Sequence, residues 1–193
     1  MEAVKMYASQ ADAVLAAVDR DGVAFSKEAY VRKKYGESAW IFLEAYRFFV
    51  REAERYVKKP AGAEFPYWAY GDLLDFDHSG NGNVQELLLP AGEAVFFQVS
   101  DWNKILCMKY IGADEAEEAR FQEKLKSCGL REDQVMRSSF YPEWKSRILG
   151  SWQRLFRFHE EILQGIRSGS LQDLSGIQAG LWQIRREWIV KRY

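Results

Sequence analysis

The stretch FPYWAYGDLLDFDHSGNGNVQELLLPAGEAVFFQVSDWN, residues 65–103, decides the fold that the sequence predicts. It holds up to three strand-like runs, at residues 67–70, 84–89 and 95–99, with a polar, glycine-rich loop between the first two. The flanking segments are mainly helical in pattern, because apolar residues recur in them every three or four positions. The sequence therefore predicts an α+β fold: a small, bent, mainly antiparallel sheet packed by four to six helices.

Length, composition and charge bound the class of protein. A chain of 193 residues, of which 48% are hydrophobic, suits a single domain with one packed core over residues 1–193. A net charge of −1 gives no strong attraction for nucleic acid or anionic lipid. No apolar run reaches the roughly 20 residues that span a bilayer, so we expect no membrane partner. The absence of a secretory signal and of paired cysteine motifs favours a cytoplasmic protein.

Two junctions between strand and helix are expected to be capped by serine. A first strand is predicted at residues 4–7, with Ser9 as the N-cap of the next helix. After the strand at residues 95–99, Ser100 is expected to cap a helix that carries Asp101 in its first turn, where the helix dipole favours a carboxylate.

The glycine-rich loop matches a calcium-binding pattern. In DFDHSGNGNVQE, residues 75–86, Asp75, Asp77 and Ser79 stand at the first three ligand positions of an EF-hand loop, and Glu86 stands at the twelfth. An EF-hand, however, has a helix on each side of the loop, whereas strand-like sequence flanks this one. The same residue types are the usual formers of turns. The sequence therefore favours a solvated connecting loop over a calcium site.

The motifs of common enzyme classes are missing from the chain. Its two histidines, His78 and His159, have no cysteine or histidine partners at zinc spacing. There is no nucleophile elbow, no phosphate-binding loop and no glycine-rich dinucleotide fingerprint after a strand. We therefore predict no metal site and no resident cofactor.

Aromatic and amide side chains gather near the ends of the predicted strands instead. These candidate ligand-binding residues are Tyr7, Gln10, Trp68, Tyr70, Asp101 and Trp102, with Gln178 in a late strand. Two interpretations are open. Such residues build hydrophobic cores, because aromatic side chains bury large areas. Polar and aromatic groups that converge at strand ends also form ligand pockets.

Six spaced motifs run through most of the chain, in the order MYASQ, KYGESA, AGAEFPYWAY, VFFQVSDWNKIL, SWQRLF and IQAGLWQIRREWIV. On these motifs the chain resembles the uncharacterised bacterial family known as domain of unknown function 3841. The family implies no established activity. The segment 75–86 lies between these motifs, which is a further argument against the calcium interpretation.

In strand order, Tyr7 and Gln10 fall on an early strand, Trp68 and Tyr70 on the next, and Gln178 on a late strand. This placement loosely resembles that of small ADP-ribosyltransferase-like domains, which hold a nicotinamide dinucleotide between such strands. The resemblance implies NAD as a substrate, an aromatic ring stacked on the nicotinamide, and Gln178 as the catalytic-site residue. Glutamine cannot act as a base. The resemblance therefore implies a relative of these domains that is either active or degenerate.

Three functions follow as hypotheses. The first is a cytoplasmic module that binds a nucleotide-like or other planar small molecule in an aromatic cleft. The second is a protein-interaction module of the toxin–antitoxin or phage-defence type, which requires an exposed apolar patch for its protein partner. The third is binding of RNA or a nucleic acid single strand through Trp182 and Trp188 beside the basic residues of the segment 185–192. The near-neutral net charge disfavours the third.

Overall fold

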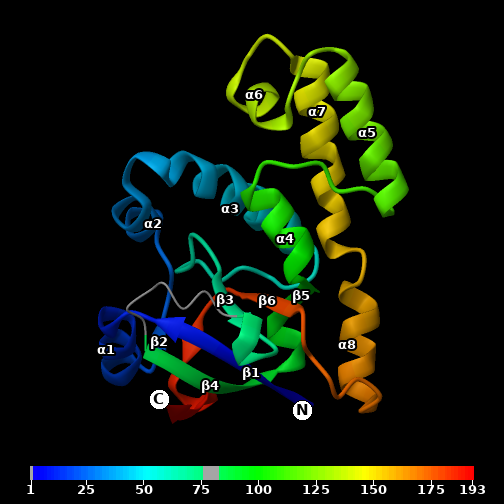
Figure 1. The fold of residues 1–193 in the computed structure, drawn as a ribbon. Coiled ribbons are helices and arrows are strands. Elements are labelled where there is room, and N and C mark those ends of the chain that lie inside the picture. The colour runs from blue at the N-terminus through cyan, green and yellow to red at the C-terminus, as the bar shows by residue number, and fades with distance from the viewer. Residues whose placement is uncertain (1, 76–82) are drawn as a thin grey trace. The chain divides into compact units, whose positions relative to one another are not determined.

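A computed structural model describes residues 2–75 and 83–193, which form two compact units (Figure 1). The first unit comprises Met1–Val99 and Phe158–Tyr193, and the second comprises Ser100–Arg157. The prediction of a single domain over residues 1–193 stays a prediction. In the part of the chain that the structure describes, no helix combines the length and the apolar character needed to cross a membrane.

The first unit is built on a six-stranded sheet with strand order β5-β6-β3-β1-β4-β8, counted over the described residues. The strands are β1 (Ala3–Gln10), β3 (Tyr67–Tyr70), β4 (Asn83–Pro90), β5 (Ala94–Gln98), β6 (Ile177–Leu181) and β8 (Ile189–Arg192). Each neighbouring pair is antiparallel. A separate antiparallel pair joins β2 (Val23–Ala24) to β7 (Ile184–Arg185). The predicted α+β fold with a mainly antiparallel sheet is confirmed.

Strand β1 is longer than predicted and takes in the residue expected to cap a helix. It pairs with β4 at every position from Ala3 to Gln10, so Ser9 lies inside the strand. The helix α1 (Asp12–Asp21) begins instead after Ala11, whose side chain makes no capping hydrogen bond. The ladder hydrogen bonds to β4 hold this segment extended in spite of its local capping signal.

Three more helices belong to the first unit: α2 (Glu28–Tyr35), α3 (Ala39–Ala53) and α8 (His159–Ser168). Helix α3 packs on one face of the sheet. The ring of Phe49 is fully buried and lies 5.0 Å from Trp68 and 5.7 Å from Phe97, measured between ring centroids. A Cβ atom built on Gly180 of β6 would stand 2.2 Å from Cζ of Phe49. Glycine at this position therefore lets α3 approach the sheet closely.

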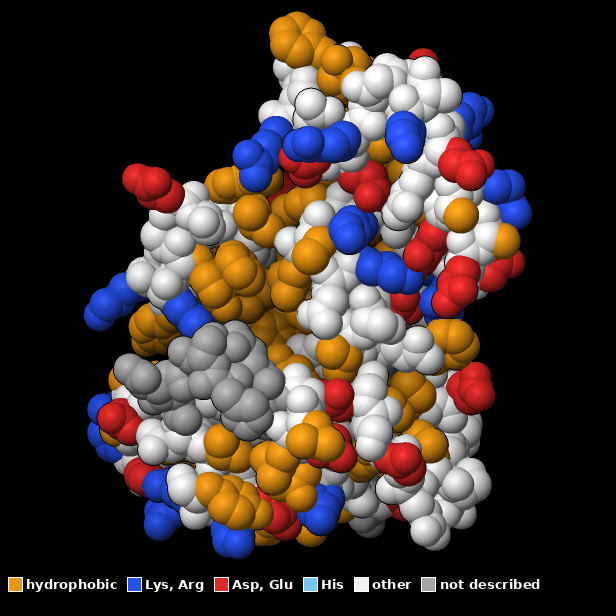
Figure 2. All heavy atoms as spheres, viewed as in Figure 1, with side chains coloured by type: hydrophobic (Ala, Val, Ile, Leu, Met, Phe, Trp, Pro, Cys, Tyr) orange, Lys and Arg blue, Asp and Glu red, His pale blue; other side chains and the backbone are white. Residues whose placement is uncertain are grey.

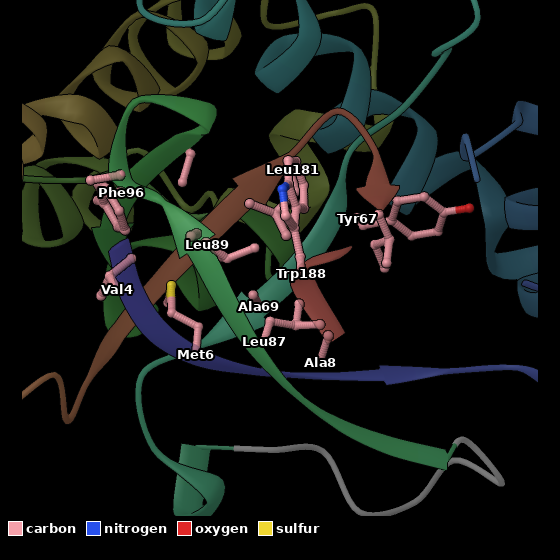
Figure 3. Close-up of a cluster of buried hydrophobic side chains, with 14 of the residues drawn as sticks. Val4, Met6, Ala8, Tyr67, Ala69, Leu87, Leu89, Phe96, Leu181 and Trp188 are labelled. Carbon is pink, nitrogen blue, oxygen red and sulfur yellow. The ribbon is translucent and has the colours of Figure 1, made fainter. Parts of the chain in front are cut away.

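The opposite face of the sheet holds the main hydrophobic core and is here called the core face (Figure 3). Val4, Met6 and Ala8 alternate along β1 into this core, and Trp188 packs among them and their neighbours. Trp182 is likewise buried, and its Nε1 donates to the carbonyl oxygen of Val57 at 2.7 Å. Both tryptophans are thus buried, whereas base stacking uses exposed rings, and the nucleic-acid hypothesis stays a prediction.

The second unit is helical, with α4 (Val99–Leu106), α5 (Glu115–Ser127), α6 (Glu132–Arg137) and α7 (Pro142–Ser151). Helix α4 begins at Val99, so Ser100, the expected N-cap, lies within its first turn. Asp114 does cap α5, accepting a hydrogen bond from the backbone N–H of Glu117 at 2.7 Å.

His159, at the start of α8, stabilises strand β5 through a buried hydrogen bond. The backbone N–H of Phe96 donates to Nδ1 of His159 at 3.0 Å, and the histidine is 2% exposed. Burial lowers the pKa of His159 from its ordinary value of 6.5. The imidazole therefore stays neutral when the protein is folded, and protonation would remove the acceptor.

We expect the first unit to lose stability in mild acid because of this histidine. The unfolded chain binds the proton first, so the contribution of His159 is complete above about pH 6.5 and is lost as the pH falls through the lower, folded-state pKa. The free energy of unfolding in urea, measured at about pH 7.5 and about pH 5, should fall by roughly 1 kcal/mol more in the wild type than in His159→Asn. Asparagine keeps an acceptor near the Nδ1 position and does not titrate. Equal falls in the two proteins would contradict the assignment.

Candidate functional site

One face of the sheet carries a row of aromatic and amide side chains. Tyr7 lies opposite Tyr70 in the β1–β3 pair, and Tyr70 lies opposite Gln178 in the β3–β6 pair. Gln178 in turn lies opposite Phe97 in the β5–β6 pair. Residues directly opposite each other in an antiparallel pair point to the same face. These four residues, with Trp68 two positions before Tyr70 on the same face, are here called the aromatic row.

Gln178 stands in the middle of the aromatic row with an unused hydrogen-bond donor. Its side chain is 1% exposed, and its Nε2 has no hydrogen-bond partner among the described residues. A buried amide without a partner costs about 1–3 kcal/mol, so native proteins rarely keep one without a use. Nε2 of Gln178 is therefore a donor without an acceptor within the described part of the chain.

Trp68 is fixed by helix α3. Its Nε1 donates to the hydroxyl of Tyr46 at 2.9 Å, and its ring meets those of Tyr46 and Phe49 edge to face, at centroid distances of 5.2 and 5.0 Å. The side chain remains partly exposed, as do those of Tyr7 and Tyr70. The row thus combines a rigid aromatic wall with surface that solvent can reach.

The hydroxyl group of Tyr46 interacts with those of two other tyrosines, Tyr35 and Tyr70. Burial raises its pKa well above the ordinary value of 10, and the neighbouring Tyr35 and Tyr70 add to this rise. Its hydroxyl therefore stays neutral at physiological pH and remains both a donor and an acceptor. Tyr35 also stacks on Phe42, with ring centroids 3.5 Å apart.

Hydrophobic side chains gather over the part of the first unit that α2 and α3 occupy (Figure 2). Tyr30 of α2 is 58% exposed and Trp40 of α3 is 43% exposed.

Gln10 does not join the aromatic row. Along β1 the buried residues Val4, Met6 and Ala8 point to the core face, and Gln10 continues this alternation. It is 8% exposed. The expectation that Gln10 converges with Trp68 treated the strand as ending at Tyr7, whereas the strand continues and carries Gln10 to the other face.

Asp101 and Trp102 belong to helix α4 in the second unit. The carboxylate of Asp101 is 1% exposed and accepts from Nη2 of Arg157 at 3.0 Å, and Nζ of Lys104 lies 3.8 Å away. Burial raises the pKa of Asp101, and the two cations oppose this rise. Asp101 therefore has a structural ion pair of its own, and a binding role for these two residues stays a prediction.

Comparison with known proteins identifies the family to which this chain belongs. The family model described as a domain of unknown function, DUF3841, matches residues 5–190. The chain belongs to the DUF3841 family. No curated protein and no solved structure matches the chain. For this DUF3841 chain, the resemblance to ADP-ribosyltransferase-like domains therefore stays a hypothesis.

The calcium-like segment 75–86 falls largely on residues 76–82, which lie outside the described part of the chain, as does His78. Its two ends already have partners. Oδ2 of Asp75 accepts from the backbone N–H of Gly176 at 2.8 Å, and Oε2 of Glu86 accepts from the hydroxyl of Tyr193 at 2.9 Å. Among the described residues, no group of three acidic, histidine or cysteine side chains is placed to hold a metal ion.

Sequence reasoning missed the helical half of the site. Tyr46 and Phe49 lie on the periodic apolar stripe of α3, and Tyr35 ends α2, so their pattern predicts only burial. The one available signal was the number of tyrosines on these two helices, because a buried tyrosine hydroxyl needs a hydrogen-bond partner.

Proposed function

We propose that this protein binds a planar, nucleotide-like small molecule against the aromatic row, as an active or degenerate relative of the ADP-ribosyltransferases. The observation that carries the proposal concerns Nε2 of buried Gln178, on the same sheet face as Trp68 and Tyr70: it has no hydrogen-bond partner among the described residues. The ligand's ring would lie against the partly exposed edge of this aromatic wall. One of its acceptor atoms would receive the hydrogen bond that Gln178 does not make within the described protein.

The chemistry of the residues limits the role of Gln178 to binding and orientation. A glutamine amide neither titrates nor acts as a general base, so any transfer reaction would depend on positioning of the bound ligand. Tyr46 remains neutral and offers a hydroxyl beside Trp68. We propose a cytoplasmic location, because Cys107 and Cys128 are free thiols.

The test is a thermal-shift screen with NAD⁺, ADP-ribose and mononucleotides on the wild type and on Gln178→Met. A ligand at about one hundred times its dissociation constant adds about 2.7 kcal/mol of stability, which raises the melting temperature by several degrees. Gln178→Met removes an unsatisfied buried amide, so the free variant should melt at or above the wild-type temperature. The melting temperature of Gln178→Met should not change with the compound that raises that of the wild type.

Gln85→Met is the matched control. Gln85 is also a glutamine at 1% exposure, and its Oε1 has no partner within residues 2–75 and 83–193, but it lies opposite Ala8 and so on the core face. This variant should keep the full ligand shift. The proposal fails if no compound in the screen shifts the wild type, or if Gln178→Met responds as the wild type does.

A further inference from the structure

Strand β1 has an unpaired edge beside the aromatic row. It pairs with β4 along all eight of its residues, but its pairing with β3 is confined to Tyr7 opposite Tyr70. Beyond Tyr70 the chain leaves the sheet at Gly71. In the described ranges, no strand accompanies residues Ala3–Lys5 on the side away from β4. Among the described residues, the strand position beside Ala3–Lys5 is therefore unfilled.

The backbone groups of this edge point into the empty position. The carbonyl oxygen of Glu2 accepts from the backbone N–H of Ala91, on the β4 side. Backbone groups alternate in direction along a strand, so those of Val4 also face β4, while those of Ala3 and Lys5 face the other way. An unpaired row of strand donors and acceptors is a template for another strand.

A surface pocket of about 450 Å³ lies along this edge. Ala3, Lys5 and Tyr7 line one side of it, and the loop 171–175 lines the other, with Ile166 of α8 contributing apolar surface. Asp72 also lines the pocket, two residues after β3 ends. The length from Ala3 to Tyr7 is about 13 Å at the rise of a strand, enough for a few residues of an extended chain.

Contacts between the two loops hold the walls of this pocket in place without a bound ligand. Oδ2 of Asp72 lies 3.4 Å from the hydroxyl of Ser175, and Asp75 holds the backbone N–H of Gly176. A Cβ atom on Gly71 would stand 2.1 Å from the carbonyl oxygen of Leu174, so the two loops are in close contact. A preformed pocket binds with less loss of conformational entropy.

We propose that this pocket binds the amino-terminal end of an extended peptide, which pairs with Ala3 and Lys5 as an added antiparallel strand. Tyr7 lies opposite Tyr70, so an occupant that continues the β3 position starts next to Asp72. Its terminal ammonium group therefore meets the carboxylate of Asp72, with Asp173 on the facing loop adding negative charge. The apolar Ile166, with the leucines of the loop 171–175, suits small or β-branched side chains.

The test uses the peptide Val-Thr-Val-Thr, with a free amino terminus and a fluorophore at its carboxyl end, in an anisotropy titration of the full chain. Two singly N-methylated forms, at the second and third residues, present their methyl groups to opposite sides of the strand. We expect saturable binding that one of the two methyl groups weakens about tenfold and the other leaves unchanged. Acetylation of the amino terminus should weaken binding to a similar extent.

Asp72→Asn tests the charge with the loop contacts preserved, because asparagine can still accept from the backbone N–H of Leu74 and bond Ser175. It should bind the free-amine peptide more weakly and the acetylated peptide as the wild type does. Asp21→Asn removes an exposed carboxylate that is paired with Arg20. It is the control and should change the binding of neither peptide.

The proposal is overturned by absence of saturable binding at millimolar protein. It is equally overturned by binding that is insensitive to both methyl groups and to acetylation. Neither result depends on a nucleotide ligand.

Discussion

Replacing Gly180 with alanine is expected to destabilise the first unit by about 3 kcal/mol, although it adds one methyl group. The added Cβ would stand 2.2 Å from Cζ and 2.7 Å from Cε1 of Phe49, well inside any contact that real Cβ atoms make. Phe49 is fully buried between Trp68, Phe97 and Trp182, so its ring has no space into which it can turn. Either the helix or the strand must shift.

The measurement is the urea midpoint of Gly180→Ala beside that of Gly92→Ala. A Cβ atom on Gly92 would have nothing within 4 Å, so this control should change stability by less than about 1 kcal/mol. The double variant Gly180→Ala with Phe49→Leu should recover part of the loss, because the smaller side chain frees the space. Additive losses in the double variant would mean that the clash with Phe49 is not the cause.

Replacing Arg157 with methionine is expected to cost the second unit about 3 kcal/mol, the lower end of the range for breaking a buried ion pair. Asp101 is 1% exposed and loses its closest cation, while the side chain of Arg157 is 28% exposed, which moderates the loss. The variant also removes the bond that Nη1 of Arg157 donates to the carbonyl oxygen of Gly112 at 2.8 Å.

The loss should depend on pH in a defined direction. Burial already raises the pKa of Asp101, and removing Arg157 raises it further, because that arginine lowers it. The folded variant then holds a proton at pH values where the unfolded chain has released it. Its deficit should therefore shrink as the pH falls towards about 4 and grow as the pH rises. A deficit that does not change with pH would contradict the role of Asp101.

Arg154→Met is the matched control for this experiment. Arg154 likewise donates to a backbone carbonyl oxygen, that of Ile111 at 2.7 Å, and it pairs with Glu117 at 3.1 Å. Glu117, however, has a side chain that is 29% exposed, so water can take the place of the arginine. This control should lose about 1 kcal/mol. Because Arg154 helps to lower the pKa of Glu117 from its ordinary value of 4.5, the deficit of the control should stay constant above that pH and shrink only below it.

The local structure was predictable where the pattern was strong. The strand expected at residues 67–70 is β3, with the same bounds, and the run at residues 84–89 lies within β4. Alternation of apolar and polar residues, together with β-branched and aromatic side chains, carries this information within a few positions of the chain. The pairing order of the strands was not predictable, because periodicity does not say which distant strand is the neighbour.

The site was predictable only in part for the same reason. Trp68, Tyr70 and Gln178 were chosen for their residue types, and the β3–β6 register places them on one face. Gln10 was chosen with them as an amide near the end of a strand predicted at residues 4–7, yet the strand pairs with β4 as far as Gln10, which therefore points to the core face. The contributions of Tyr46 and Phe49 depend on the docking of α3, which no local pattern specifies.

The strand order has a consequence for how the chain reaches its native state. Strand β6, near the end of the chain, lies between β5 and β3, which are both made long before it. Until residue 181 has left the ribosome, β3 and β5 each present an unpaired edge, and the aromatic row lacks its central residue. Such long-range pairing slows folding and leaves a nascent chain open to association through its exposed edges. Synthesis of β6 is therefore the step that joins β5 to β3 and brings Gln178 into the aromatic row.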